Sequence, residues 1–241
     1  MRLFVIFLSC FYTLLFASCS DQNKVMKTTD HVYKYEVAKQ YFAEGLYNRS
    51  SLLLSEVVLP LKGTEKGEES LFLLAMASFN AKNYDAASSY FKKYYESYPR
   101  GNYAEEARFY CGKSLYLNVP ETKLDQTATY EAVTELQNLL EYFPSGRFAS
   151  KAQELIFDLQ DKLVEKEYLS AKLYYDLGDY FGNCSNGGSN YQACIITAEN
   201  AIIDYPYTSR REDFAVLILK AKFELAHQSV EEKKVERYHD A

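Results

Sequence analysis

Aromatic side chains recur along the first half of the chain at a fixed interval of 37 residues. Tyr35, Phe72 and Phe109 are separated by that interval. Because a fixed period of roughly 20–50 residues is the signature of stacked supersecondary units, the pattern predicts a repeated helical hairpin. The same interval also separates a second aromatic set and a set of small residues, namely Phe42, Phe79 and Tyr116, and Ala38, Ala75 and Gly112.

The spacing within each unit indicates how its first helix packs. Tyr35 and Phe42 are seven residues apart, so two helical turns place both rings on one face. Ala38 between them lets a neighbouring helix approach closely. This arrangement is typical of tetratricopeptide (TPR) units, which are about 34 residues long. We therefore predict an all-α fold, a superhelical solenoid of about five TPR-like helix hairpins.

Proline positions and apolar runs set the predicted helix limits. An aromatic residue followed by proline ends the second helix of several units, because proline cannot continue a helix and restricts the residue before it. Asp30 and Asn102 are candidate N-caps. The aromatic–proline pairs are Tyr98-Pro99, Phe143-Pro144 and Tyr205-Pro206, and the small residues twelve positions before each proline are Ala87, Ala132 and Cys194. The predicted helices span 31–43, 48–59, 68–81, 84–98, 103–117, 127–142, 148–180 as one kinked helix or two, 191–205, 211–228 and 229–238. Continuation of the chain past Ala241 stays open.

The N-terminus is predicted to be a targeting segment. Arg2 precedes an apolar run over 3–16 that is too short for a comfortable transmembrane helix, so residues 1–18 are expected to be a signal peptide. Small residues followed by Cys19 resemble a bacterial lipobox, in which the cysteine becomes the acylated first residue. The alternative is an ordinary signal peptide with an incidental Cys19. Residues 19–30 are polar and are interpreted as a lipidated flexible tether.

Composition and motifs argue against several functions. The 241-residue chain carries a formal charge of −6 and has a pI near 5.3, so nucleic acid is not an expected partner. The three histidines lie far apart, and we find no metal-ligand spacing, phosphate-binding loop or nucleophile motif. We expect no enzyme activity, no metal and no cofactor other than the covalent lipid on Cys19. Cys184 and Cys194 flank a Gly-rich turn, and either a disulfide between them or separate buried thiols fits the sequence.

The aromatic positions have two interpretations that the sequence leaves open. One is an exposed apolar ladder lining a groove that binds extended peptides. The other is packing between repeats inside the core. The candidate groove residues are Tyr35, Phe42, Phe72, Phe79, Phe109 and Tyr116, and Tyr168 and Tyr175 occupy the same two positions in the fourth unit.

The ordered set of these features resembles the BamD family, the TPR lipoproteins of the outer-membrane β-barrel assembly machinery. The resemblance covers nearly all of residues 19–241 and is carried by Ala132, Tyr142-Phe143-Pro144-Ser145, Lys166-Glu167-Tyr168, Ala171, Tyr174-Tyr175, Tyr191, Glu199 and Asp204-Tyr205-Pro206. The sequence departs from the family at an insertion over 182–190 and at Thr197, where relatives often carry arginine.

The resemblance implies a lipid-anchored protein on the periplasmic side of the outer membrane. It implies that units one to three, residues 31–144, meet unfolded β-barrel precursors. It also implies that units four and five, residues 145–241, dock on periplasmic domains of the barrel-forming subunit through Tyr168, Tyr175 and Thr197. Other assembly lipoproteins are further expected partners.

Two other functions remain open from the sequence. A surface carbohydrate-binding lipoprotein also uses TPR helices, but such sites stack sugars on aromatic rings, often tryptophan, and this chain has no tryptophan. A general TPR adaptor for cell-envelope proteins is the other alternative.

Overall fold

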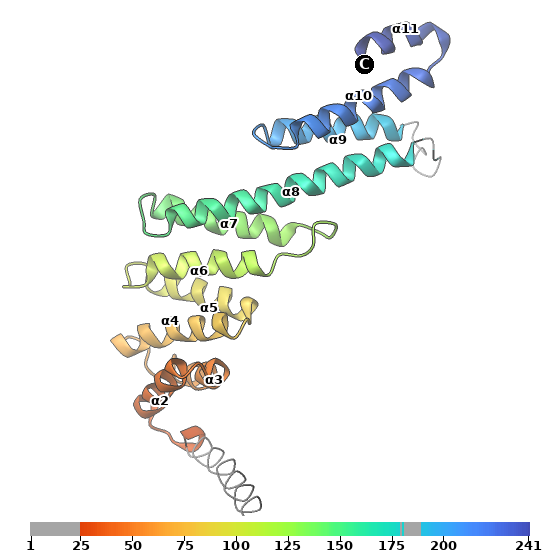
Figure 1. The fold of residues 1–241 in the computed structure, drawn as a ribbon. Helices are drawn as coiled ribbons and strands as arrows, with labels where there is room; N and C mark the ends of the chain where they lie inside the picture. Colours follow the sequence, from red (N-terminus) through yellow and green to blue (C-terminus); the bar gives the residue numbers. More distant parts are fainter. Residues whose placement is uncertain (1–24, 179, 181–188) are drawn as a thin grey trace, which may run out of the picture. The chain divides into compact units, whose positions relative to one another are not determined.

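A computed structural model describes residues 25–178, 180 and 189–241 (Figure 1). The all-α prediction is confirmed, since no strand occurs in these ranges. The helices are α2 (His31–Ala43), α3 (Tyr47–Val57), α4 (Glu65–Asn80), α5 (Tyr84–Ser97), α6 (Ala104–Leu117), α7 (Thr127–Tyr142), α8 (Ala149–Leu177), α9 (Asn190–Asp204), α10 (Arg211–His227) and α11 (Glu231–Asp240).

The described chain divides into two compact units. The first unit consists of the described residues up to 118 together with 134–152. The second consists of 119–133 and the described residues from 153 onward. This division falls inside α7 and α8, whereas the sequence places the boundary after Pro144. The continuity of the two helices explains the difference, because each helix gives one segment to each unit.

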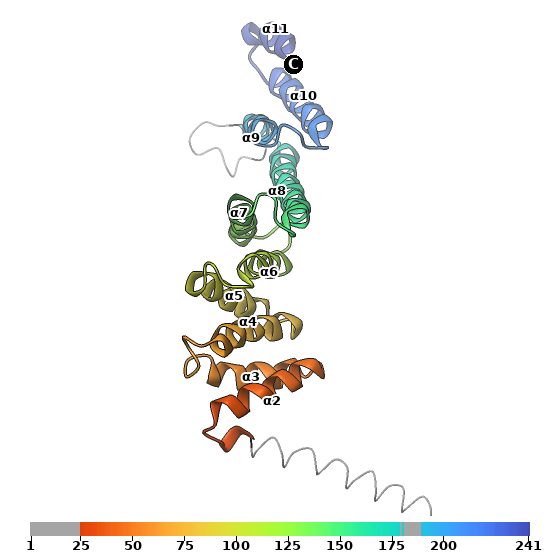
Figure 2. The same cartoon turned by 90° about the vertical axis from the view of Figure 1, so that its left-hand side faces the viewer.

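In the first unit, α2 to α6 pack in chain order, each against the next (Figure 1, Figure 2). The small residues of the repeat lie where the helices approach most closely. Ala38 and Ala75 are fully buried. A Cβ added at Gly112 would lie 2.6 Å from the Leu136 side chain on α7, so this contact requires glycine or a displaced leucine.

The folded body begins earlier than the sequence suggests. Residues 25–27 form a helical turn, and Val25 is buried in one cluster with Val57 and Leu61. The Lys34 ammonium, itself buried, donates to the Met26 carbonyl at 3.1 Å and pairs with the Glu56 carboxylate at 2.5 Å. The expectation of a flexible tether over 19–30 is therefore wrong from Val25 onward, and residues 19–24 lie outside the described ranges. Asp30 caps α2 as predicted, by accepting from the Tyr33 N–H at 3.0 Å.

The first helix of each of three hairpins ends in the left-handed conformation. Gly45, Lys82 and Gly178 have φ of 76°, 61° and 47°. Their N–H groups donate to the carbonyls of Phe42, Phe79 and Tyr175, three residues earlier, at 3.1, 2.9 and 3.1 Å. Gly45 and Lys82 are 37 residues apart, so the backbone repeats with the sequence even where glycine has been replaced.

Replacing Lys82 with glycine is expected to stabilise the first unit by about 0.5–1 kcal/mol. A left-handed non-glycine residue costs roughly 1–2 kcal/mol, and the greater freedom of glycine in the unfolded chain offsets part of the gain. Urea unfolding followed by circular dichroism would measure it. Gly45→Ala is the reverse control and should destabilise the unit. Nothing lies within 4 Å of the added Cβ, so only the left-handed backbone conformation disfavours the alanine. If Lys82→Gly lowered the unfolding free energy, contacts of the Lys82 side chain would outweigh the cost of its left-handed backbone.

The aromatic–proline pairs form one recurring turn. Tyr98 and Tyr205 end α5 and α9 with nearly the same dihedral angles, φ −130° and ψ 65° against φ −125° and ψ 66°. The carbonyls of Tyr98, Phe143 and Tyr205 each accept from the N–H three residues later. The predicted small residues twelve positions before each proline are confirmed as core positions, since Ala87, Ala132 and Cys194 are fully buried.

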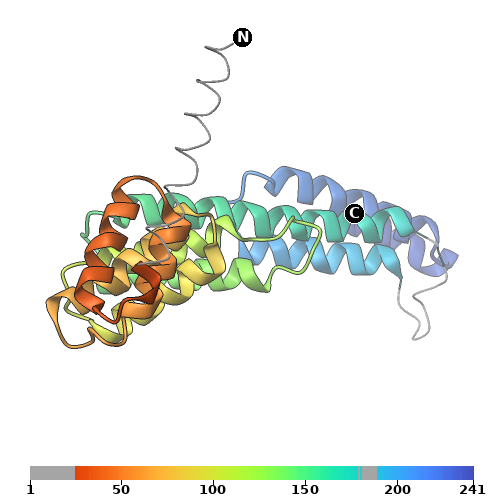
Figure 3. The same ribbon diagram turned by 90° about the horizontal axis from the view of Figure 1, so that it is seen from below.

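In the second unit, the C-terminal part of α8 lies beside α9 and α10 (Figure 3). α8 is one helix of 29 residues rather than two, consistent with the lack of glycine and proline between its ends. Its Ala171 packs in a cluster with Cys194, Ala198 and Phe214. Within the described ranges, we find no helix that is long and apolar enough to cross a membrane.

Candidate functional site

The first aromatic row of the predicted groove is core. Tyr35, Phe72 and Phe109 are only 2%, 7% and 4% exposed. Phe72 stacks on Tyr103 with centroids 4.3 Å apart, and Phe109 stacks on Phe148 at 4.5 Å. Each of these two rings thus packs against the residue that precedes the first helix of the next hairpin. Of the two interpretations left open by the sequence, core packing is correct for this row, and an exposed ladder at these three positions is wrong.

The second aromatic row lies nearer the surface. Phe42, Phe79 and Tyr116 are all partly exposed. Phe42 meets Tyr47 edge-on at 5.4 Å, and Phe79 meets Tyr84 in the same way at 5.6 Å. These two pairs occupy the same positions in successive repeats, so the second row keeps partly exposed side chains where the first row is buried.

A charged network borders these rings in the first two hairpins. The Glu69 carboxylate accepts from the Tyr35 hydroxyl at 2.5 Å and pairs with Lys39 at 2.7 Å. Burial, followed by the hydrogen bond to Glu69, raises the pKa of Tyr35 to about 12. Burial would raise the pKa of Glu69, but hydrogen bonds from Lys39 and Tyr35 outweigh it and lower that pKa. Glu36 pairs with Lys66 beside them, so the charges here are matched within the protein.

Two glutamates that the sequence analysis missed hold the turns between hairpins. The Glu68 carboxylate on α4 accepts from the Tyr94 hydroxyl at 2.6 Å and from the Asn102 N–H at 2.9 Å. The prediction that Asn102 caps α6 is wrong. Tyr103 occupies the N-cap position, and the Asn102 N–H donates to Glu68 instead. A Cβ at Gly101 would lie 2.6 Å from Glu68 Oε1, so glycine leaves room for the carboxylate.

Glu105 repeats this arrangement 37 residues later. Its carboxylate accepts from the Phe148 N–H at 3.0 Å, and a Cβ at Gly146 would lie 2.4 Å from Glu105 Oε1. The sequence carried the signal, since Glu68 and Glu105 share the period of the rings. We call these two contacts, Glu68 with the Asn102 turn and Glu105 with the Phe148 turn, the glutamate latches.

Replacing Glu68 with alanine is expected to destabilise the first unit by about 1–3 kcal/mol. The change leaves the buried Tyr94 hydroxyl without its acceptor and frees the Asn102 N–H. Glu68→Gln keeps an acceptor oxygen and should lose less. Urea unfolding of both variants measures the difference, and equal losses in the two would contradict a role for the accepting oxygen.

The predicted docking residues of the second unit do not form one open patch. Tyr168 is partly buried, with its ring edge against Phe214 and the Arg210 guanidinium 4.6 Å from its centroid. Tyr175 is partly buried against Tyr191, with centroids 5.8 Å apart. Thr197 on α9 is partly exposed. The two tyrosines support the core, while Thr197 stays a surface candidate.

The second unit also displays apolar side chains that the sequence analysis did not single out. Phe157, Ile203 and Tyr207 are 58%, 72% and 100% exposed. Phe157 and Tyr207 line a cavity of about 200 Å³, together with Asp161 and Asp204. The sequence held a signal for Tyr207, because the residue after the proline is polar in the other two aromatic–proline turns.

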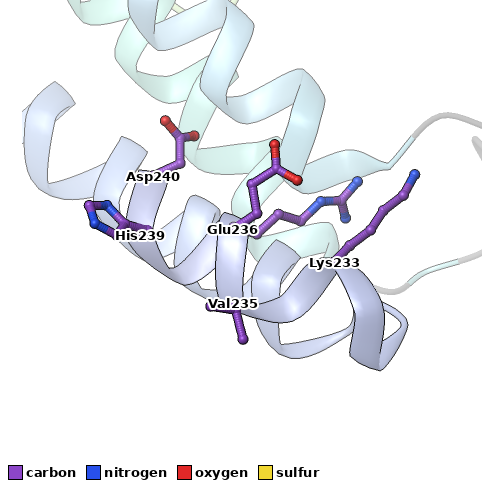
Figure 4. A pocket seen from close by; sticks show the side chains of 6 residues that line it. Lys233, Val235, Glu236, His239 and Asp240 are labelled. Atoms are coloured by element: carbon purple, nitrogen blue, oxygen red, sulfur yellow. The ribbon is translucent and has the colours of Figure 1, made fainter.

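Two further hollows lie in this unit. Figure 4 shows side chains of α11, including Val235, Glu236 and His239, that diverge around a depression of about 710 Å³. They do not converge on a point where a ligand would sit. A hollow of about 370 Å³ on α8 is lined by Lys166, Leu173 and neighbouring residues.

The described cysteines are buried thiols. Burial raises the pKa of the Cys111 thiol, and it raises the pKa of Cys194 to about 11, so neither is a ready nucleophile. Cys184, and with it the disulfide proposed to Cys194, lies outside the described ranges. Among the residues that the structure describes, no group of three His, Cys, Asp or Glu side chains could hold a metal ion.

Comparison with known proteins gives a family match across the repeats. A family model described as YfiO, outer membrane lipoprotein, matches residues 28–238. A curated protein named outer membrane protein assembly factor BamD, from Aquifex aeolicus, is 26% identical over 167 residues, which is 68% of this chain and 55% of that protein. The match thus spans about half of the relative's length.

Among solved structures, the chain is similar to TPR-like repeats of a kinesin light chain from Podosopora anserina. The two are 14% identical, with 86% of this chain and 91% of that chain covered and a TM-score of 0.36.

Proposed function

Because this chain belongs to the family of outer membrane lipoproteins described as YfiO, we propose that it is an assembly factor for outer-membrane β-barrel proteins. The observation that carries the proposal is the extent of the family match, which runs over 28–238 and so includes nearly every described helix. The curated relative named as a BamD assembly factor supports the same role.

The proposed anchor is a lipid on Cys19, which fixes the protein to the periplasmic side of the outer membrane. Two or three acyl chains would hold it stably where a single chain would not. The protein then acts by holding its partners close together and catalyses no bond-making step. Its contribution is a raised effective concentration of precursor near the assembly site.

Precursor binding is proposed at the second aromatic row. Phe42, Phe79 and Tyr116 have exposed ring area, whereas the first-row rings are buried between hairpins. An unfolded β-barrel segment is extended and carries alternating apolar side chains, which suits rigid aromatic contacts. Phe79→Ala should therefore weaken binding of a peptide taken from a barrel strand.

Docking on the barrel-forming subunit is proposed at the second unit. The exposed side chains of Phe157, Ile203 and Tyr207 supply apolar area, and Asp161 and Asp204 add negative charge to the hollow that Phe157 and Tyr207 line. The partner is expected to be a periplasmic domain of that subunit. Apolar area with flanking charge is typical of a protein interface.

Affinity capture of the full-length protein from detergent-solubilised membranes tests this function. A large β-barrel subunit with periplasmic domains is the expected partner, and other assembly lipoproteins should accompany it. Ile203→Asp should lose that partner, while Leu173→Asp, at another exposed apolar site, this one on α8, should retain it. Capture of an outer-surface transporter would instead favour the carbohydrate-binding alternative. Capture of neither would favour a general adaptor.

A further inference from the structure

The turn between α3 and α4 displays an apolar side chain on a fixed backbone. Leu59 is 75% exposed, while Leu61 two residues later is buried at 9%. The Leu59 carbonyl accepts from the Lys62 N–H at 3.2 Å, and the Leu61 carbonyl accepts from the Thr64 N–H at 3.1 Å. The turn is thus pinned by Leu61 and holds Leu59 away from the core.

This turn lies at the end of the first hairpin where the N-terminal segment enters. Leu61 and Val25 share one buried cluster, so the turn and the start of the folded body are neighbours. α2 also begins at this end, and its first turn exposes Val32 and Tyr33 at 44% and 50%. Lys62, in the same turn as Leu59, is also exposed. Apolar, aromatic and basic side chains are therefore exposed at the same end of the hairpin.

The distance from the proposed lipid to this surface is short. Cys19 and Val25 are six residues apart in the sequence. Six residues span at most about 22 Å, whatever their conformation. The headgroup layer of one leaflet is about 5–8 Å thick. An acylated Cys19 would therefore keep Val25, and the turn beside it, within about 15 Å of the headgroup surface.

We propose that the Leu59 turn is a membrane contact, in which Leu59 enters the headgroup region and Lys62 meets lipid phosphates. The inference rests on the lipid anchor of the proposed function. An aromatic such as Tyr33 suits the same depth, because its ring is apolar and its hydroxyl is polar. The short covalent link favours a lipid surface over a protein partner, since it holds this end of the hairpin at the bilayer.

The absence of tryptophan from the chain makes a direct depth measurement simple. Leu59→Trp and Leu46→Trp each give a protein with one tryptophan. Leu46 is 37% exposed and precedes α3, which is roughly 16 Å long, so it lies at the opposite end of the hairpin. The acylated full-length variants would be reconstituted into vesicles of phosphatidylethanolamine and phosphatidylglycerol with brominated acyl chains. Thermal melts equal to wild type would show that both variants fold.

The expected result is loss and blue shift of tryptophan emission for Leu59→Trp, with emission of Leu46→Trp unchanged. Equal quenching of the two, or none, would overturn the membrane contact while leaving the anchor intact. A blue shift of Leu59→Trp that appears only after addition of a captured partner protein would overturn it in favour of a protein interface. If mass spectrometry finds no acyl chain on Cys19, both the lipid anchor and the membrane contact that rests on it are overturned. The capture experiment still tests the assembly function independently.

Discussion

Replacing Phe72 with alanine is expected to lower the free energy of unfolding of the first unit by about 3–5 kcal/mol. The ring is 7% exposed and contacts three other rings, with centroids 4.3 Å away for Tyr103, 5.6 Å for Tyr94 and 6.0 Å for Phe91. Its removal would leave a cavity that these large side chains cannot fill without changing rotamers. The result would be measured by urea unfolding followed by circular dichroism.

Phe79→Ala is the matched control, because it removes the same side chain two turns later on α4. Its ring is partly exposed, so the expected loss is smaller, about 1–2 kcal/mol. Peptide affinity should show the opposite order. Phe79→Ala should weaken peptide binding while the protein stays folded, although its effect on the unfolding free energy is the smaller of the two. Similar unfolding free energies for the two variants would show that the first row is not a core row.

Replacing Gly67 with alanine is expected to destabilise the first unit by about 1–3 kcal/mol or more. At a solvent-exposed helical site the same change would stabilise by about 1 kcal/mol, so the predicted sign is reversed. The reason is steric: a Cβ at Gly67 would lie 2.1 Å from the Leu61 carbonyl oxygen and 2.7 Å from its carbon. These are backbone atoms of a pinned turn and cannot move aside as a flexible side chain would.

Glu65→Ala in the same first turn of α4 is the control for this prediction. Glu65 is exposed, so its replacement should change the unfolding free energy by no more than about 0.5 kcal/mol. Thermal and urea unfolding of both variants give the comparison. A Gly67→Ala protein as stable as wild type would mean that the turn at Leu61 shifts freely, which would also weaken the case for a rigidly displayed Leu59.

The helix limits were largely predictable because the signals that set them are local. The predicted and observed limits agree for 31–43 and 127–142, and the others differ by a few residues. Proline after an aromatic ends a helix whatever its surroundings. The choice between one helix and two over 148–180 needed the structure, since nothing in the sequence there either breaks or requires continuity.

The fate of the rings was not predictable from spacing alone. Phe72 and Phe79 lie on one face of one helix, yet the first is buried and the second is not. Phe72 is enclosed by rings that include Tyr103, which stacks on it from a turn 31 residues away in the sequence. Phe79, in contrast, meets Tyr84 and Tyr110 edge-on and stays partly exposed. A helical period indicates which side chains share a face, but not which chain segment covers each end of that face.

The polar residues that support the core were also not predicted, because their partners are distant in the sequence. Lys34 appears as one charge among many in the sequence, and only the structure brings Glu56 and the Met26 carbonyl to it. Glu68 and Glu105 did carry a signal, because they repeat with the rings. Weighing charged positions for periodicity as well as apolar ones would have found them.

The glutamate latches bear on how such a chain is duplicated or shortened. In each latch the acid belongs to one hairpin and the amide it binds belongs to the linker leading into a later one. A cut made at the hairpin borders would separate every acid from its amide. The exchangeable segment therefore does not coincide with one hairpin. It begins before one glutamate and ends after the linker whose amide that glutamate binds.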